Sequence, residues 1–552
     1  MAGLGPGRAP GGGGSMSARD VTPEWDWTAQ GRALGVGADG SFNAGLLHLG
    51  ADPAVIWHRE DGSTHRYSGA ALMRRAGEIA GVLSALGVGR GDRVAGLISR
   101  RPAVFATALA VWRLGAVYVP LFSGFGGDGL RVRLVDSGPK VVVTDPANRA
   151  NLAAVQDVLP DLRTLMVGGA GEPGDALLDD MINRLNGVPA PVATGLHETS
   201  TIMYTSGTTG RPKGCLIPHR AVLSLLPYVR YCLGVGPGDV LFSGADAGWS
   251  FGLFTTGLAP MSQGVSRVVY EGPFSAEGWW SCVRAVDAGH VAAAPTAFRQ
   301  LAAAGAKLVP PGFRAATSAG EPLDAATIDW FDRTVGVVVH DSYGLSELGM
   351  VTGNLRHPGA PAVAPGSMGV ALPGFEVDLL DPDGSPVRGP GEGRVAVRDN
   401  GYFLSAGYWG REDEWAARFA DGWFLTEDLA RRDEEGRYWY VGRADDVIVS
   451  AGYNVGPVEV ETVLLEHPLV VDAACVGEPD PVKGQVVAAH IVLADAGTTP
   501  RPEDLLRELR TWVGQRVGWH AAPRRLHLHP AIPRTATGKV QRRALREGGN
   551  RW

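Results

Sequence analysis

The chain has 552 residues, of which 45% are hydrophobic and 20% are charged, and its formal net charge is -7. This length exceeds what one hydrophobic core usually organises, so we expect at least two domains of an ordinary globular kind. The acidic balance provides no basic face for DNA or RNA, and no apolar run approaches the roughly 18 residues that cross a bilayer. Neither nucleic-acid binding nor a membrane span is expected.

The first 20 residues, MAGLGPGRAPGGGGSMSARD, lack the apolar segment of a secretory signal and are predicted to form a disordered tail or linker. GGGGS before Met16 fits either an engineered linker or an upstream start. The four cysteines (Cys215, Cys232, Cys282 and Cys475) are scattered, without a CxxC pair or nearby histidines. This pattern argues against a zinc site and a disulfide framework, and we expect a cytoplasmic protein.

Short apolar strands alternate with amphipathic helical stretches between residues 50 and 350. RVAGLIS (93–99) predicts a strand, and PAVFATALAVWRLG (102–115) predicts the helix after it. Because apolar runs of this kind are buried on both faces, they favour mostly parallel sheets covered by helices. Further strands are predicted at 116–121, 140–145, 164–168, 200–206, 267–272, 290–295 and 335–344.

The pattern changes twice towards the C-terminus. Between 366 and 443, polar and apolar residues alternate around DG and PG turns, which favours antiparallel hairpins or a small barrel. From 446 to 552 the chain has its own predicted helix (458–468) and strands (472–479 and 485–495). We therefore expect a second, smaller domain there.

YTSGTTGRPKG (204–214) follows a predicted buried strand and ends near Lys213. A glycine-rich turn exposes successive backbone N–H groups that hold phosphate oxygens, and a lysine adds a mobile cation. The run does not match the Walker pattern GxxxxGK[ST]. By itself it fits a solvated hairpin loop at least as well as a phosphate site.

Polar residues also follow two later predicted strands, in SAGEPL (318–323) and HDSYGLSE (340–347). Ligands of open α/β sheets sit at the carboxyl ends of strands, so Tyr343 is a candidate for stacking on a base and Glu347 for holding Mg²⁺. The alternative interpretation of Glu347 is a lone surface glutamate without a ligand. Charged residues also lie beside glycines in two further segments: GWFLTEDLARRDEEGRYWYVGRADDVIVSAGYNVGPVEVE (422–461) and PRTATGKVQRRALRE (533–547).

These five motifs, in this order, resemble those of the adenylate-forming superfamily: acyl-CoA synthetases, luciferases and the adenylation domains of nonribosomal peptide synthetases. The resemblance covers about residues 25 to 548 and is nearest to medium-chain or aryl acyl-CoA ligases. It implies an α/β fold with a large N-terminal AMP-binding domain (21–443) of two αβ subdomains plus a small β-barrel. A hinge (444–446) and a mobile α+β C-terminal lid domain (447–552) would follow.

The resemblance also implies roles for individual residues. A loop over the β- and γ-phosphates would comprise Thr205, Ser206, Gly207, Thr208, Thr209, Gly210 and Lys213. The adenine wall would comprise Gly320, Glu321, Pro322, Asp341, Ser342 and Tyr343. Ser346 would contact the α-phosphate, Glu347 would ligate Mg²⁺ and serve catalysis, and Asp428 and Arg443 would hold the ribose. Lys539 would be the catalytic lysine of adenylation, Asp445 the hinge, and Gly452 a wall of the tunnel for coenzyme A.

Trp249 stands where relatives carry an aromatic residue between acyl pocket and tunnel, although an ordinary core tryptophan fits equally well, and Gly349 is placed near the acyl pocket. Three positions depart from the usual pattern. Ser346 replaces a threonine but keeps the hydroxyl, Glu427 adds a charge beside Asp428, and Asn454 stands where many acyl-CoA synthetases carry an arginine.

The resemblance implies an ATP-dependent acyl-CoA synthetase that uses ATP, Mg²⁺ and CoA on an apolar aliphatic, aryl or bulky secondary-metabolite acid. One alternative is an enzyme that forms the acyl-adenylate and relies on a carrier protein or a separate thiolating partner. Another is a nucleotide-binding protein without catalysis, against which Lys213, Glu347 and Lys539 argue. A homodimer is left open.

Overall fold

The computed structural model describes residues 23–155, 157–185, 187–205, 212–444, 446–450, 453–480, 484–494, 501–535 and 539–548. The predictions for residues 1–20, Ser206 to Gly210, Asp445, Gly452 and the side chain of Asn454 lie outside this description.

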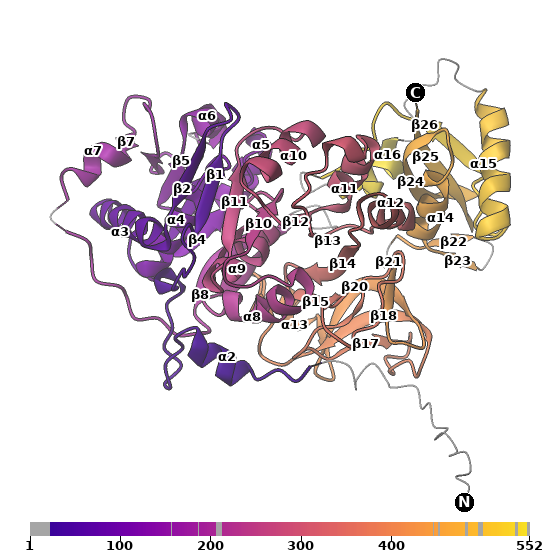
Figure 1. Cartoon of the computed structure of the whole chain (residues 1–552), viewed down its shortest axis with the longest axis horizontal. Helices are drawn as coiled ribbons and strands as arrows, with labels where there is room; N and C mark the ends of the chain where they lie inside the picture. Colours follow the sequence, from indigo (N-terminus) through magenta and orange to yellow (C-terminus); the bar gives the residue numbers. More distant parts are fainter. Residues whose placement is uncertain are drawn as a thin grey trace, which may run out of the picture.

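Two mostly parallel sheets form the larger part of the molecule, as predicted (Figure 1). The first runs in the order β7 (Ala176–Leu177), β6 (Arg163–Met166), β5 (Val141–Thr144), β3 (Arg93–Leu97), β4 (Val117–Pro120), β8 (Thr199–Thr205) and β9 (Lys213–Pro218). The second runs β16 (Val370–Ala371), β15 (Gly349–Gly353), β14 (Val339–Leu345), β13 (Ala315–Ala319), β12 (His290–Ala293), β10 (Val240–Ser243), β11 (Ser266–Tyr270), β1 (Val55–His58) and β2 (Thr64–Tyr67).

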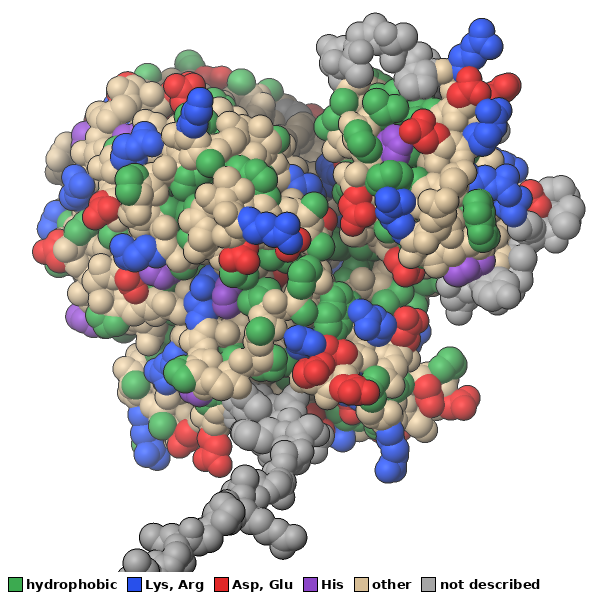
Figure 2. All heavy atoms as spheres, turned by 45° about the vertical axis from the view of Figure 1, so that its right-hand side comes forward, with side chains coloured by type: hydrophobic (Ala, Val, Ile, Leu, Met, Phe, Trp, Pro, Cys, Tyr) green, Lys and Arg blue, Asp and Glu red, His purple; other side chains and the backbone are tan. Residues whose placement is uncertain are grey.

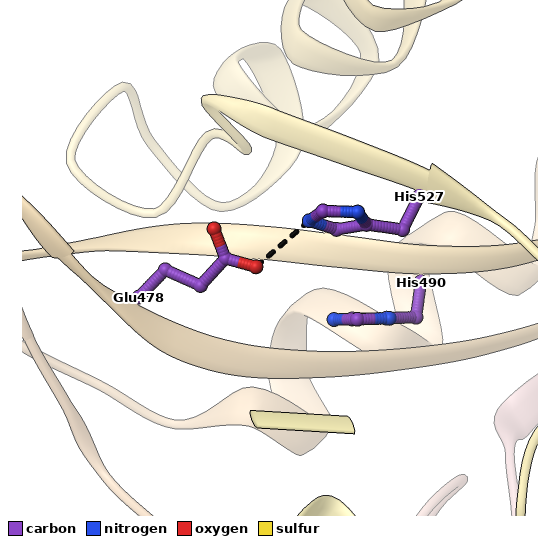
Figure 3. Close-up of side chains that lie close together, drawn as sticks. All are labelled: Glu478, His490 and His527. Atoms are coloured by element: carbon purple, nitrogen blue, oxygen red, sulfur yellow. Dashed lines mark hydrogen bonds and ion pairs between the residues drawn. The ribbon is translucent and has the colours of Figure 1, made fainter. Parts of the chain in front are cut away.

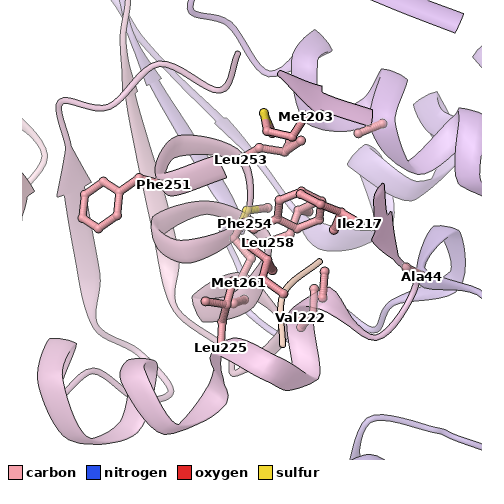
Figure 4. Close-up of a cluster of buried hydrophobic side chains, with 14 of the residues drawn as sticks. Ala44, Met203, Ile217, Val222, Leu225, Phe251, Leu253, Phe254, Leu258 and Met261 are labelled. Atoms are coloured by element: carbon pink, nitrogen blue, oxygen red, sulfur yellow. The ribbon is translucent and has the colours of Figure 1, made fainter. Parts of the chain in front are cut away.

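Helices cover these sheets because their apolar faces need burial. The main ones are α3 (Gly69–Ala85), α4 (Ala103–Arg113), α5 (Gly127–Ser137), α8 (Ala221–Tyr228), η4 (Phe251–Leu258), α10 (Ala276–Ala285), α11 (Pro295–Ala303) and α12 (Ala325–Val335). Helix α4 is buried along nearly its whole length, and its Trp112 stacks on Phe254 of η4 with ring centroids 5.6 Å apart. Figure 4 shows Phe254 within the hydrophobic cluster that joins η4 to β8, β9 and α8. This packed core therefore holds the ends of the sheet strands in fixed positions.

An antiparallel sheet follows, as the DG and PG turns predict. It consists of β17 (Val377–Leu380), β18 (Gly391–Arg398), β20 (Trp423–Arg432), β19 (Phe419–Ala420) and β21 (Tyr438–Arg443). Figure 1 shows it in orange below the large sheets. Its strand pairing sets Asp428 opposite Arg443.

The C-terminal part has its own sheet and core. The sheet contains β23 (Tyr453–Val455), β22 (Ile448–Ser450), β25 (Gly484–Leu493), β24 (Val470–Asp480) and β26 (Arg525–Leu528). Helices α14 (Pro457–Leu465), α15 (Pro502–Arg516) and α16 (Arg542–Gly548) pack on it, and Leu505, Leu509 and Val513 of α15 are fully buried against β24 and β25 residues. A large N-terminal and a small C-terminal domain are thus confirmed.

Two interpretations of Asp341, Ser342 and Tyr343 came from the sequence: that they belong to the strand predicted at 335–344, or that they follow a strand end. The first is confirmed and the second is wrong, since all three lie inside β14. The reason is that β15 pairs with this segment on its second edge and extends the strand to Leu345. Asp341 and Ser342 are consequently buried in the sheet.

Candidate active site

A cavity of about 150 Å³ lies where the carboxyl ends of β8, β13 and β14 meet the antiparallel sheet and the C-terminal domain. This is the edge at which open α/β sheets bind ligands. The structure gathers around it many of the residues predicted from the motifs: Thr205, Lys213, Trp249, Gly320, Ser346, Glu347, Gly349, Asp428, Arg443 and Lys539. Five motifs separated by more than three hundred residues therefore converge on one site.

A larger cleft of about 1130 Å³ adjoins this cavity between the two domains, and Figure 2 shows the groove from outside. It is lined by the other predicted adenine-wall residues, Glu321, Pro322, Asp341, Ser342 and Tyr343. Gly320, Asp428, Arg443 and Lys539 border both spaces, so the two are continuous. A nucleotide can extend from the cleft into the cavity.

Lys213 begins β9, directly opposite Thr205 at the end of β8. Its Nζ lies 2.7 Å from Glu414 Oε2 and 5.3 Å from the centre of the Tyr408 ring. Glu414 is half exposed, and ion pairs with exposed partners are weak, so a phosphate can compete for this lysine. Glu414 carries no motif and was missed from the sequence.

Glu347 follows β14, and Tyr408 donates its hydroxyl to Glu347 Oε1 at 2.7 Å. Burial raises the pKa of Tyr408, so the phenol stays protonated and holds the carboxylate in place. A carboxylate with a neighbouring hydroxyl, here Ser346, suits Mg²⁺, which keeps most of its other ligands as water and phosphate oxygens. The donor set therefore fits the predicted metal.

Asp428 is 4% exposed and accepts two phenol hydroxyls, from Tyr343 at 2.7 Å and Tyr440 at 3.1 Å. Burial raises the pKa of both phenols well above its ordinary value, so both remain donors. Tyr343 was predicted to stack on a base; in the structure its hydroxyl connects the predicted adenine wall to Asp428. Tyr440 was missed; it lies in β21 opposite Ala430 of β20, and no motif marks it.

Glu427 does not leave an uncompensated charge beside Asp428. Arg418 Nη2 lies 2.8 Å from Glu427 Oε1, and Arg443 donates to Glu427 Oε2. Two guanidinium groups thus neutralise the unusual carboxylate and fix Arg443 at the cavity wall. Arg418 has no motif signal.

Trp249 forms one wall of the cavity rather than part of the deep core, since it is half-buried. Its indole packs on Gly320, whose φ is +103°, and a Cβ there would lie 3.0 Å from the ring. The ring centre of Phe251 lies 5.6 Å away. Gly349 (φ +77°) faces Leu404 in the same wall, where a Cβ would lie 3.2 Å away.

Lys539 is exposed at the mouth of the cavity, at the start of the last described segment. Its backbone N–H donates to Thr535 Oγ1 at 3.1 Å. Just beyond it, Arg542 binds Glu461 (2.7 Å) and Arg546 binds Asp446 (2.7 Å). These ion pairs anchor the segment that presents the lysine.

Comparison with known proteins agrees with this arrangement. The AMP-binding enzyme family matches residues 48–409, and the AMP-binding enzyme C-terminal domain matches residues 459–539. The acetyl-coenzyme A synthetase of Bacillus subtilis (strain 168) is 32% identical over 504 residues, covering 89% of this chain and 86% of that protein. The chain therefore belongs to the AMP-binding enzyme family.

Two solved structures show the same architecture. The acyl-CoA synthetase of Brucella canis is 34% identical with a TM-score of 0.74, covering 96% of this chain and 98% of that one. A benzoate CoA ligase from Burkholderia xenovorans LB400 is 25% identical with a TM-score of 0.80, covering 92% and 100%. The predicted family, fold class and AMP-forming ligase class are confirmed. Within the described residues, no helix is long and apolar enough to cross a membrane.

Proposed function

We propose that this chain is an ATP-dependent acyl-CoA synthetase that forms an acyl-adenylate with release of pyrophosphate and then transfers the acyl group to CoA. The observation that carries the proposal is the presence of Lys539, from the C-terminal domain, in one cavity with Glu347, Asp428 and Arg443. A protein that only bound nucleotide would have no evident use for a lysine brought across a domain boundary.

Negative charge grows on the oxygens around the α-phosphorus as the carboxylate attacks. Lys539 would stabilise that charge, and losing one such group typically costs about 3–4 kcal/mol of barrier. Lys213 would hold the departing pyrophosphate, while Asp428 and Arg443 orient the ribose. Magnesium, held by Glu347 when bound, supplies further neutralisation of the phosphate charge.

Thioester formation would follow a rotation of the C-terminal domain at Asp445 that withdraws Lys539 and brings in the segment containing Gly452. Asn454 in that segment keeps open the alternative that the adenylate passes to a carrier protein or a thiolating partner. A cytoplasmic location and a homodimer stay predictions from the sequence.

We further propose that the acid is small, with a short aliphatic chain or a single aromatic ring. The cavity has a volume of about 150 Å³, and a void of about this size accommodates benzene. Trp249, which packs on Gly320, forms one of its walls. A bulky secondary-metabolite acid has the least support of the three classes expected from the sequence.

The test is to incubate the protein with ATP, Mg²⁺, CoA and acids from acetate to benzoate and a bulky polycyclic acid, following pyrophosphate release and product mass. Acyl-CoA from the small acids is expected. Acyl-AMP without thioester would favour the carrier-protein alternative, and ATP binding with no pyrophosphate release would refute the enzyme assignment. Turnover of only the bulky acid would overturn the proposed substrate size.

A further inference from the structure

Four side chains from three strands of the C-terminal sheet form a polar cluster. Glu478 lies on β24, His490 on β25 and His527 on β26, and His529 follows directly after β26. His490 and His527 are paired in register on neighbouring parallel strands. Figure 3 shows their two rings one above the other with Glu478 at their open end. None of the four lines either cavity described above.

Hydrogen bonds within the cluster fix which atoms face the centre. His527 Nε2 lies 2.7 Å from Glu478 Oε1, and His490 Nδ1 lies 2.8 Å from His529 Nε2. The rings of His490 and His527 are stacked with centroids 4.6 Å apart. Arg525 donates to the other oxygen of Glu478 at 2.7 Å, which leaves Oε1 to His527.

His490 is 1% exposed, and its Nε2 has no hydrogen-bond partner among the described residues. Such an orphaned polar atom costs free energy unless a ligand satisfies it. In the tautomer in which His490 Nδ1 donates its proton to His529 Nε2, the buried Nε2 presents a lone pair, which is how metal-binding histidines are usually arranged.

We propose that Glu478, His490 and His527 form a zinc site that ties β24, β25 and β26 together. The ligand atoms lie within 4.8 Å of one another. Zinc–nitrogen and zinc–oxygen bonds of about 2.0–2.2 Å place tetrahedral ligand atoms roughly 3.3 Å apart. Side-chain rotations that move the ligand atoms by about 1–1.5 Å therefore bring them onto one ion. Zinc takes the place of the hydrogen between His527 and Glu478 and satisfies His490 Nε2.

A set of two histidines and one carboxylate is a common zinc donor set, with water as the fourth ligand. His527 is partly exposed, which gives the ion a path from solvent. His529 would be a positioning residue that orients His490. The expectation of no zinc site rested on the cysteines, which are all buried and take no part in this cluster.

The test is calorimetric titration of tag-free full-length protein with Zn²⁺ after chelator treatment. One tight equivalent is expected in the wild type, and His490→Gln and His527→Gln should each weaken it at least tenfold. Glu347→Gln and His48→Gln, which changes an exposed histidine, should retain it. Zinc affinity unchanged by both cluster variants, or no binding at all, would overturn the proposal.

Thermal unfolding separates a lost ligand from a damaged fold. Zn²⁺ should raise the Tm of the wild-type protein reversibly, with EDTA restoring the starting value, because a ligand of the native state stabilises it. His490→Gln should fold, as shown by circular dichroism, without the zinc-dependent shift. An equal zinc-dependent shift in His490→Gln would count against the site as firmly as unchanged affinity.

Discussion

Replacing Trp249 with alanine should open the acyl pocket to longer acids. The indole lines the cavity beside Gly320, and it is larger than a four-carbon chain. Each buried methylene contributes about 0.8 kcal/mol, so the four extra methylenes of hexanoate over acetate contribute about 3 kcal/mol. The ratio of kcat/KM for hexanoate to that for acetate should therefore rise about 200-fold.

The assay is pyrophosphate release with each acid at saturating ATP, for wild type, Trp249→Ala and Trp519→Ala. Trp519 is 58% exposed in the C-terminal domain, and its removal should leave the ratio unchanged. A ratio in Trp249→Ala within about threefold of wild type, with the fold intact, would show that Trp249 does not end the acyl pocket. It would then serve only packing.

Three further changes test other parts of the site. Glu347→Gln should lower the adenylation rate about 10²–10³-fold and raise the Mg²⁺ concentration required, measured by pyrophosphate release; normal Mg²⁺ dependence would refute its role. Tyr343→Phe removes a hydrogen-bond donor from buried Asp428, so Tm should fall and the KM for ATP should rise. Unchanged values would show that this hydrogen bond contributes neither to stability nor to ATP binding. Burial raises the pKa of Asp341 to about 8 against about 4 in the unfolded chain, so its stabilising contribution is full below pH ~4 and is lost as pH rises towards 8. Asp341→Asn should thus gain Tm relative to wild type between pH 5 and 8, and parallel Tm profiles would contradict this.

Much of the fold could be predicted because apolar runs and turn residues report burial directly. Strands β3, β4 and β5 lie within the predicted ranges, and the helix predicted at 102–115 is α4 (Ala103–Arg113). The strand predicted at 335–344 is β14, but the interpretation of Asp341 to Tyr343 as residues past a strand end was wrong, because the pairing with β15 depends on a later part of the chain. Pairing partners of this kind leave no local periodicity in the sequence.

In the candidate site, too, some residues could be predicted from the sequence and others could not. Lys213, Glu347, Asp428 and Lys539 stand in recognisable motifs, and all four border the cavity. Their supporting groups, including Tyr408 and Arg418, act through single hydrogen bonds or ion pairs from segments without a motif. The histidine cluster was equally hidden, because His490 and His527 meet only through strand register.

We propose that Lys539 is delivered to this cavity for adenylation and is dispensable for the transfer to CoA. The direct measurement compares the two half-reactions in Lys539→Ala: pyrophosphate release from acid and ATP, and thioester formation from supplied acyl-AMP and CoA. We predict that pyrophosphate release falls at least 10²-fold while thioester formation stays within a few-fold of wild type. Adenylation at a near wild-type rate, or an equal loss of both half-reactions in a folded variant, would contradict it.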